Sequence, residues 1–176
     1  MLISVLGIFV ADLAFFAEKI PIEGETVIGN KYVIGPGGKG SNQAVAAAKA
    51  GAKTYFISKI GDDQFGSMAK QIYDEAGVDY SQVIVSKQHA TGAAGILVNK
   101  KGQNAINVVT GAGGTLTIQD IDNASHAIRK SSVFLTNLEV PKDAVYHSLR
   151  TAKASNVLTI LNPAPASEID EDIYSY

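Results

Sequence analysis

The chain has 176 residues, a formal net charge of −2 and a composition that is 46% hydrophobic and 18% charged. These values suit one folded domain and exclude extensive disorder, and they argue against nucleic acid and membranes as partners. There is no cysteine, which excludes disulfides, thiolate nucleophiles and cysteine-based zinc sites. We therefore expect a soluble, cytoplasmic protein.

Short apolar runs of strand length occur along the chain, and helical stretches separate the later ones. Near-continuous apolar strands that alternate with helices are typical of a parallel sheet covered on both faces. In chain order, the sequence predicts strand 3–10, helix 41–50, strand 54–60, helix 64–76, helix 118–130, strand 133–138, helix 142–154 and strand 157–161.

Two further regions have β character but break this alternation. Residues 23–34 lie between the first strand and a glycine-rich turn, and residues 94–99 and 104–110 flank the polar loop 100–103. A short polar loop that contains glycine, between β-rich runs, indicates a hairpin. These pieces predict a small second sheet that projects from the main one.

The glycine-rich turn at 35–40 leads directly into the alanine-rich helix. Its glycines leave backbone N–H groups uncovered, and the start of the helix adds unpaired donors and a partial positive charge. Lys39 and Asn42 add a cation and an amide at the same place. The turn is therefore a candidate site for a small, oxygen-rich ligand.

The same turn also satisfies the dinucleotide-binding pattern G-x-G-x-x-G, with Asp62 at about the expected distance downstream. However, that pattern normally follows the first strand of its βαβ unit, whereas here it follows the extra β region. A phosphate-binding Walker loop is excluded because Gly40, not Ser or Thr, follows Lys39. A nicotinamide-dinucleotide-binding protein stays open as an alternative.

Several collinear motifs resemble the ribokinase-like (phosphofructokinase B) family of sugar kinases. They are GETV at 24–27, GGKGSNQA at 37–44, Gly51, GDD at 61–63, TG at 91–92, LE at 138–139 and NPAPA at 162–166. The resemblance implies an α/β fold with a doubly wound, mostly parallel sheet, three layers deep, and a small β-sheet lid. It further implies that residues 1–176 are the N-terminal part of one such domain, without the C-terminal part of the fold. The lid segments are then expected at about 18–34 and 91–110.

The resemblance also implies a function and a site. Family members use ATP and Mg²⁺, with a monovalent cation as a further candidate, to phosphorylate a hydroxyl of a sugar. By position, Asp12, Gly38, Lys39, Asn42 and Glu139 are expected to bind the sugar. The expected reaction is phosphorylation of a primary hydroxyl of D-ribose or a similar sugar. A nucleoside kinase or a fructose kinase of the same family stays open. The resemblance implies a homodimer through the lid.

The chain departs from the family pattern in two respects. Val10 stands where ribokinases often have Asn, which removes one polar contact from the expected site. The G-A-G-D motif, which supplies the catalytic base and the anion hole, does not occur, and no residue of this chain is expected to be catalytic or to bind a metal. Asp62 and Asp63 are interpreted as caps of the helix that follows them. We therefore expect the chain to be inactive alone.

Overall fold

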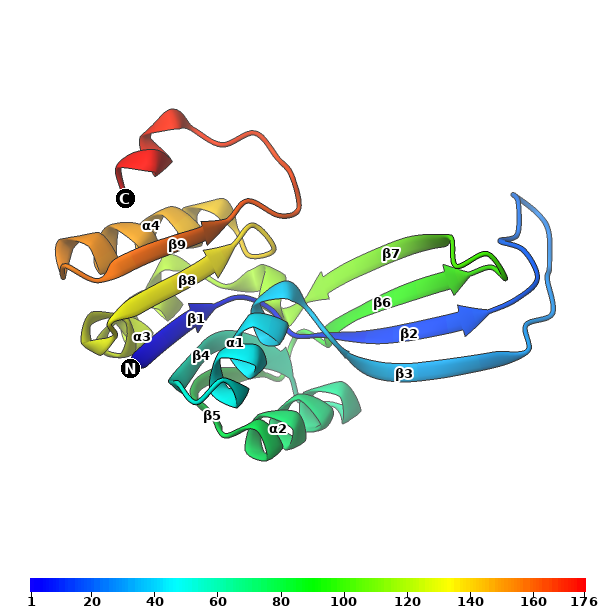
Figure 1. Cartoon of the computed structure of the whole chain (residues 1–176), viewed down its shortest axis with the longest axis horizontal. Coiled ribbons are helices and arrows are strands. Elements are labelled where there is room, and N and C mark those ends of the chain that lie inside the picture. The colour runs from blue at the N-terminus through cyan, green and yellow to red at the C-terminus, as the bar shows by residue number, and fades with distance from the viewer.

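Two β-sheets divide the chain into a body and a projecting arm, which we call the lid (Figure 1). The computed structural model describes residues 1–176. The sheet of the body has five parallel strands in the order β5-β4-β1-β8-β9, and the sheet of the lid has four strands in the order β3-β2-β6-β7. The lid is mixed, since β2 runs parallel to β6 but antiparallel to β3.

The elements have the following bounds. The body strands are β1 (Leu2–Leu6), β4 (Lys53–Gly61), β5 (Val78–Ser86), β8 (Val133–Asn137) and β9 (Leu158–Asn162). The lid strands are β2 (Val10–Phe16), β3 (Lys31–Gly37), β6 (Thr91–Val98) and β7 (Asn104–Gly111). The helices are α1 (Lys39–Lys49), α2 (Gln64–Ala76), α3 (Ile118–Lys130) and α4 (Lys142–Ala154), with short 3₁₀ turns η1 (Ala112–Thr115) and η2 (Glu171–Ser175).

Helices cover both faces of the body sheet, so the predicted three-layer architecture is confirmed (Figure 1). On one face, α1 and α2 pack on a cluster that includes Phe9, Phe56 and Tyr73. On the other face, α3 and α4 pack on a larger cluster that includes Ile57 and Phe134. A parallel sheet buried on both faces requires strands that are apolar on both sides, which is the pattern of the sequence. No helix is both long and apolar enough to cross a membrane.

The predicted bounds of α2, α3 and α4 agree with the structure, and α2 and α3 carry clear helix-start signals. Asp63 caps α2 by accepting a hydrogen bond from the amide of Gly66, as predicted. Asp62, by contrast, is exposed and does not cap the helix. The α3 helix begins with a capping box formed by Thr117 and Asp120.

The predicted strand 3–10 is wrong at its end, because β1 stops at Leu6 and a separate strand begins at Val10. Residues 7–9 carry the chain out of the body sheet, and β2 belongs to the lid. The break is hidden in the sequence because Ile8, Phe9 and Val10 are all buried. An unbroken apolar run therefore covers two strands of different sheets.

The other differences concern the lid and one edge of the body. Of the predicted β region 23–34, only the last residues belong to β3, and residues 17–30 form a loop without regular structure. The predicted hairpin at 94–110 is confirmed by β6 and β7. The edge strand β5 was not predicted, since its apolar residues are mixed with polar ones.

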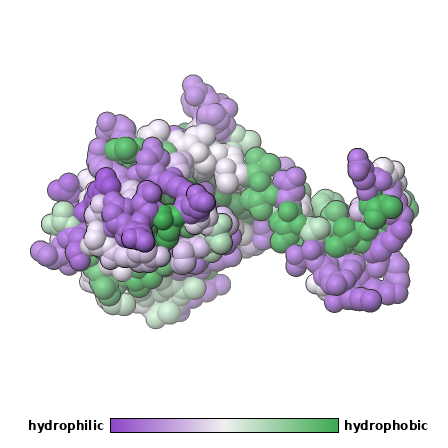
Figure 2. Space-filling view, turned by 90° about the horizontal axis from the view of Figure 1, so that it is seen from above, coloured by the Kyte–Doolittle hydropathy of each residue, from purple (hydrophilic) through white to green (hydrophobic).

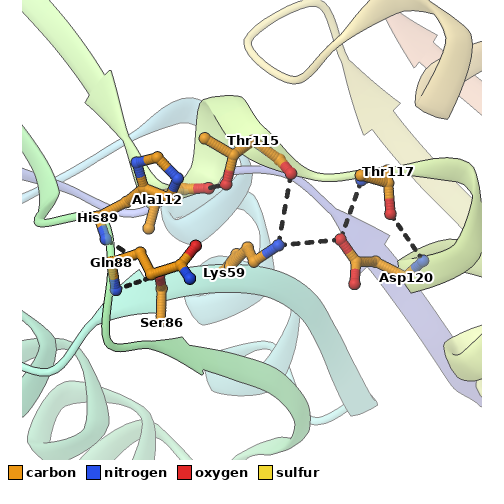
Figure 3. Close-up of polar contacts among 8 residues, drawn as sticks. All are labelled: Lys59, Ser86, Gln88, His89, Ala112, Thr115, Thr117 and Asp120. Carbon is orange, nitrogen blue, oxygen red and sulfur yellow. Dashed lines mark hydrogen bonds and ion pairs between the residues drawn. The ribbon is translucent and has the colours of Figure 1, made fainter.

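The segment that leaves the lid is held to the body by Lys59 of β4 (Figure 3). Its ammonium group donates to a carboxylate oxygen of Asp120 at 3.1 Å and to the carbonyl oxygen of Thr115 at 3.4 Å. Burial alone would raise the pKa of Asp120, but the hydrogen bonds from Thr117 and Lys59 outweigh burial and lower the pKa. These two bonds of Lys59, which we call the brace, thus join η1 and α3 to the body sheet.

Candidate functional site

The start of α1 depends on two glycines. Gly38 has φ +88°, and a β-carbon there would lie 2.3 Å from the carbonyl oxygen of Ile8. A β-carbon at Gly37 would lie 2.4 Å from a carboxylate oxygen of Asp12. The backbone can therefore turn into the helix beside Ile8 only because Gly38 lacks a side chain, and a side chain at Gly37 would displace the carboxylate of Asp12.

Lys39 and Glu139 form an ion pair at the start of α1. The ammonium nitrogen of Lys39 lies 2.9 Å from Glu139 Oε1, and the backbone amide of Lys39 donates to Glu139 Oε2 at 2.7 Å. Gly38 offers no side-chain cap, so the carboxylate of Glu139 satisfies a free donor of the helix terminus. The side chain of Glu139 is 11% exposed and that of Lys39 is 43% exposed, so the lysine reaches solvent.

Glu139 is itself positioned by a buried residue, Asn137, at the end of β8. The side-chain oxygen of Asn137 accepts a hydrogen bond from the amide of Glu139 at 3.0 Å, and its amide group donates to Gln43 of α1 at 3.4 Å. Asn137 is fully buried. Sequence reasoning missed it, although a polar residue at the end of an apolar strand is a signal for this role.

Asp12 lies in β2, in the lid, whereas the predicted strand 3–10 would place it just beyond the end of the first body strand. The correction follows from the break at residues 7–9. Burial raises the pKa of the Asp12 carboxyl, repulsion from Glu139 raises it further, and attraction to Lys39 opposes both. Asp12 is therefore a carboxylate held in an environment that disfavours its charge.

The five predicted residues, Asp12, Gly38, Lys39, Asn42 and Glu139, line one pocket of about 220 Å³. Its remaining lining is apolar and comes entirely from the lid strands: Val10, Ala94, Ile96, Ile106 and Val108. These five follow the alternation of the lid strands, since the pairing places Val10, Ala94, Ile96, Ile106 and Val108 on one face of the sheet. The pocket is smaller than the ~300 Å³ at the low end for drug-sized ligands, which suits a smaller molecule.

A larger cavity, of about 440 Å³, lies toward the tip of the lid. Its lining is mainly apolar and aromatic, its charged residues are Lys19 and Lys31, and Lys19 is already paired with Glu25 outside the lining. It includes none of the five predicted residues. A ligand site is marked by convergent polar groups rather than by size alone, so we assign the candidate site to the smaller pocket.

The arrangement does not support a dinucleotide site. Gly35 and Gly37 belong to β3, an antiparallel strand of the lid, and the helix that follows leads back to the body. A dinucleotide-binding turn instead joins a parallel strand of the main sheet to its helix. The exposed Asp62 is not part of the pocket.

Comparisons with known proteins agree with the fold. Residues 1–175 match the family described as pfkB family carbohydrate kinase. The chain is similar to ribokinase of Mus musculus, with 36% identity over 98% of this chain and 54% of the mouse protein. It is also similar to deoxyribokinase of Salmonella typhi, with 37% identity over 93% of this chain and 54% of that protein.

Among solved structures, the chain is similar to Arabidopsis thaliana ribokinase complexed with ribose and ATP. The TM-score is 0.81 at 28% identity, over 93% of this chain and 53% of that chain. The chain thus spans about half the length of these relatives.

Proposed function

The chain belongs to the pfkB family of carbohydrate kinases, and we propose that it supplies the sugar-binding part of an ATP-dependent kinase for D-ribose or a similar sugar. One observation carries the proposal. Residues from the lid, the start of α1 and the end of β8 converge on one small pocket that is polar on one side and apolar on the other. A monosaccharide has the same division, with hydroxyls at its rim and C–H groups on its faces.

The side chains of the pocket match the chemistry of a polyol. The carboxylates of Asp12 and Glu139 accept hydrogen bonds from hydroxyls, and Lys39 and Asn42 donate to hydroxyl oxygens. Because a site built to bond hydroxyls is left with unpaired buried groups when the hydroxyls are missing, such a site discriminates strongly. Asp12 and Glu139 therefore act as orienting residues that fix which hydroxyl faces away from the pocket floor.

ATP and Mg²⁺ are proposed as the co-substrate and its metal, on the strength of the family and of the ATP that the Arabidopsis relative binds. No three His, Asp or Glu side chains of this chain lie close enough to hold a metal ion. We therefore assign no residue here to Mg²⁺ and derive no step through it. The residues of the pocket bind and orient, and none is assigned as the catalytic base.

The identity of the sugar depends on the apolar side of the pocket. Val10 is buried and lines the pocket without a group that can bond a hydroxyl, so a sugar with one hydroxyl fewer loses nothing there. This admits 2-deoxy-D-ribose as a second candidate, in keeping with the deoxyribokinase relative. The volume of about 220 Å³ favours a monosaccharide over a nucleoside. Calorimetric titration with D-ribose, 2-deoxy-D-ribose, D-fructose and adenosine separates these candidates.

The 176-residue chain alone is expected to bind sugar without phosphorylating it, because the pocket holds no group assigned as base or anion hole. The measurement is a coupled assay of ADP release in the presence of Mg-ATP and D-ribose. We expect release to stay at the level of the sugar-free control. Sugar-dependent ADP release that disappears in the variant Asp12→Asn would show that the chain is a complete enzyme.

We further propose that two copies associate through their lids, in the cytoplasm. Tyr32, Val33, Ile106 and Val109 are each more than half exposed, and apolar residues line much of the arm in Figure 2. The strands β3 and β7 are unpaired edges, which favour association with another chain. Sedimentation velocity is expected to show a dimer that the variant Val109→Lys weakens and the variant Leu158→Lys, on the body, does not. A monomer at all concentrations would contradict the proposal.

A further inference from the structure

The chain passes between the body and the lid four times, and one of these crossings is held by a side-chain cluster. The crossings join β1 to β2, β3 to α1, β5 to β6 and β7 to η1. The lid projects as an arm from this joint (Figure 1). Where the chain enters β6, the carboxylate of Asp63, at the start of α2, contacts Thr91, the first residue of the strand.

The carboxylate of Asp63 makes three hydrogen bonds. One oxygen accepts from the backbone amide of Thr91 at 2.8 Å, and the other accepts from the hydroxyl of Thr91 at 2.7 Å and from the amide of Gly66 at 2.8 Å. The hydroxyl of Thr91 accepts in turn from the amide of Gly61 at 2.8 Å. Thr91 is 5% exposed, so these bonds lie away from solvent and join α2, β4 and β6 at one point.

The cluster is more than a helix cap. Capping α2 requires only the bond from Gly66, whereas the two bonds to Thr91 reach a residue 28 positions away in the lid sheet. A β-carbon at Gly61 would lie 2.5 Å from the Asp63 carboxylate and 2.5 Å from the amide of Thr91. The absence of a side chain at Gly61 thus allows the end of β4 to approach the cluster this closely.

Thr91, which Asp63 contacts, also precedes the residues of β6 that form the apolar wall of the pocket. Ala94 and Ile96, three and five residues after Thr91 on the same strand, line the candidate sugar pocket. At the neighbouring exit, the amide of Ala112 donates to the carbonyl oxygen of Ala90 at 2.7 Å, and the brace of Lys59 follows (Figure 3). Rotation of β6 at Thr91 would therefore move the apolar wall, together with Asp12 on the paired strand β2, away from Lys39 and Glu139.

We propose that Asp63 and Thr91 form a latch that fixes the orientation of the lid and thereby positions the apolar wall of the sugar pocket. Both are positioning residues, since neither lines the pocket. The inference about sugar affinity rests on the proposed function, whereas the inference about lid orientation does not.

The test measures the orientation of the lid directly. Because the chain has no cysteine, the exposed Lys101 in the hairpin loop and the exposed Lys130 at the end of α3 can be replaced by cysteine and spin-labelled. Pulsed EPR is expected to give one narrow distance distribution for the parent chain. The variants Asp63→Ser, which keeps a capping side chain, and Thr91→Val, which keeps the volume, are expected to broaden or shift it.

Two matched variants control for stability. Thr54→Val removes a buried threonine hydroxyl that donates to Ala52 at the opposite end of β4, and it must leave the distance distribution unchanged. Thr91→Ser keeps the hydroxyl and must behave like the parent.

If the latched population of the two latch variants, Asp63→Ser and Thr91→Val, falls to about a tenth, their apparent dissociation constant for D-ribose rises about tenfold.

The outcomes separate the two proposals. A distance distribution that is unchanged in both Asp63→Ser and Thr91→Val, in chains that still unfold cooperatively on heating, overturns the latch. A parent chain that binds no sugar overturns the proposed function but leaves the distance measurement to decide the latch. Altered distances with unaltered sugar affinity overturn the link between lid orientation and the pocket.

Discussion

Replacing Gly38 with alanine is expected to destabilise the chain by about 3 kcal/mol and to abolish sugar binding. The residue has φ +88°, and the new β-carbon would meet the carbonyl oxygen of Ile8 at 2.3 Å and the amide of Val10 at 3.1 Å. The backbone must therefore move at the point where α1 begins. Since Lys39 and Asn42 follow directly, the polar side of the pocket moves with it. Urea denaturation followed by circular dichroism measures the loss of stability.

The control for this prediction is Gly51→Ala. Gly51 has nearly the same φ, +91°, but a β-carbon there would meet nothing within 4 Å. Only the conformational cost remains, which is about 1 kcal/mol. Equal losses in the two variants would show that the close approach to Ile8 is not what makes Gly38 necessary.

Replacing Asp12 with asparagine is expected to weaken sugar binding about 30-fold, equivalent to about 2 kcal/mol. Asparagine has the same shape but offers one accepting oxygen instead of two and no charge. Calorimetric titration with D-ribose measures the change. The matched control is Asp62→Asn, at an exposed carboxylate outside the pocket, which is expected to bind like the parent. A dinucleotide-binding protein would instead bind NADH, and it would lose that binding in Asp62→Asn and keep it in Asp12→Asn.

The same substitution is not expected to destabilise the fold. Burial, together with repulsion from Glu139, raises the pKa of Asp12 despite the attraction of Lys39, so the folded chain binds a proton more tightly than the unfolded chain does. As the pH falls from neutral toward the ordinary pKa of aspartate, Asp12 takes up its proton in the folded chain first. The free energy of unfolding therefore increases over this range as far as Asp12 is concerned. Asp12→Asn removes that pH dependence, and its melting temperature at pH 7 is expected to equal or exceed that of the parent. A clearly lower melting temperature would contradict this.

Much of the body could be predicted from the sequence because its signals are local. The caps at Asp63 and Thr117 mark where α2 and α3 begin, and Gly77 marks where α2 ends. The break between β1 and β2 could not be predicted, since Ile8 and Phe9 are as buried as the strand residues around them. Only the pairing of β2 with β3 and β6 places it in the lid.

The polar side of the candidate site was more predictable than the apolar side. The glycine turn identified Lys39 and Asn42 from local chemistry, whereas Asp12 and Glu139 were assigned through the family resemblance. Asn137 was missed although it ends an apolar strand, and the second role of Asp63 was missed because its partner, Thr91, is distant in sequence. The bond from Asp63 to Thr91 joins the start of α2 in the body to the first residue of the lid strand β6, and no local pattern indicates such a contact.

The central claim is that the pocket between the lid, α1 and β8 holds a sugar. Titration of the ¹⁵N-labelled chain with D-ribose, followed by two-dimensional NMR, tests it most directly. We predict saturable shifts of the amide signals of Gly38, Lys39, Asn42 and Glu139, strongly weakened in Asp12→Asn. An unchanged spectrum at saturating ribose, or shifts confined to the larger cavity around Phe15 and Tyr32, would contradict it.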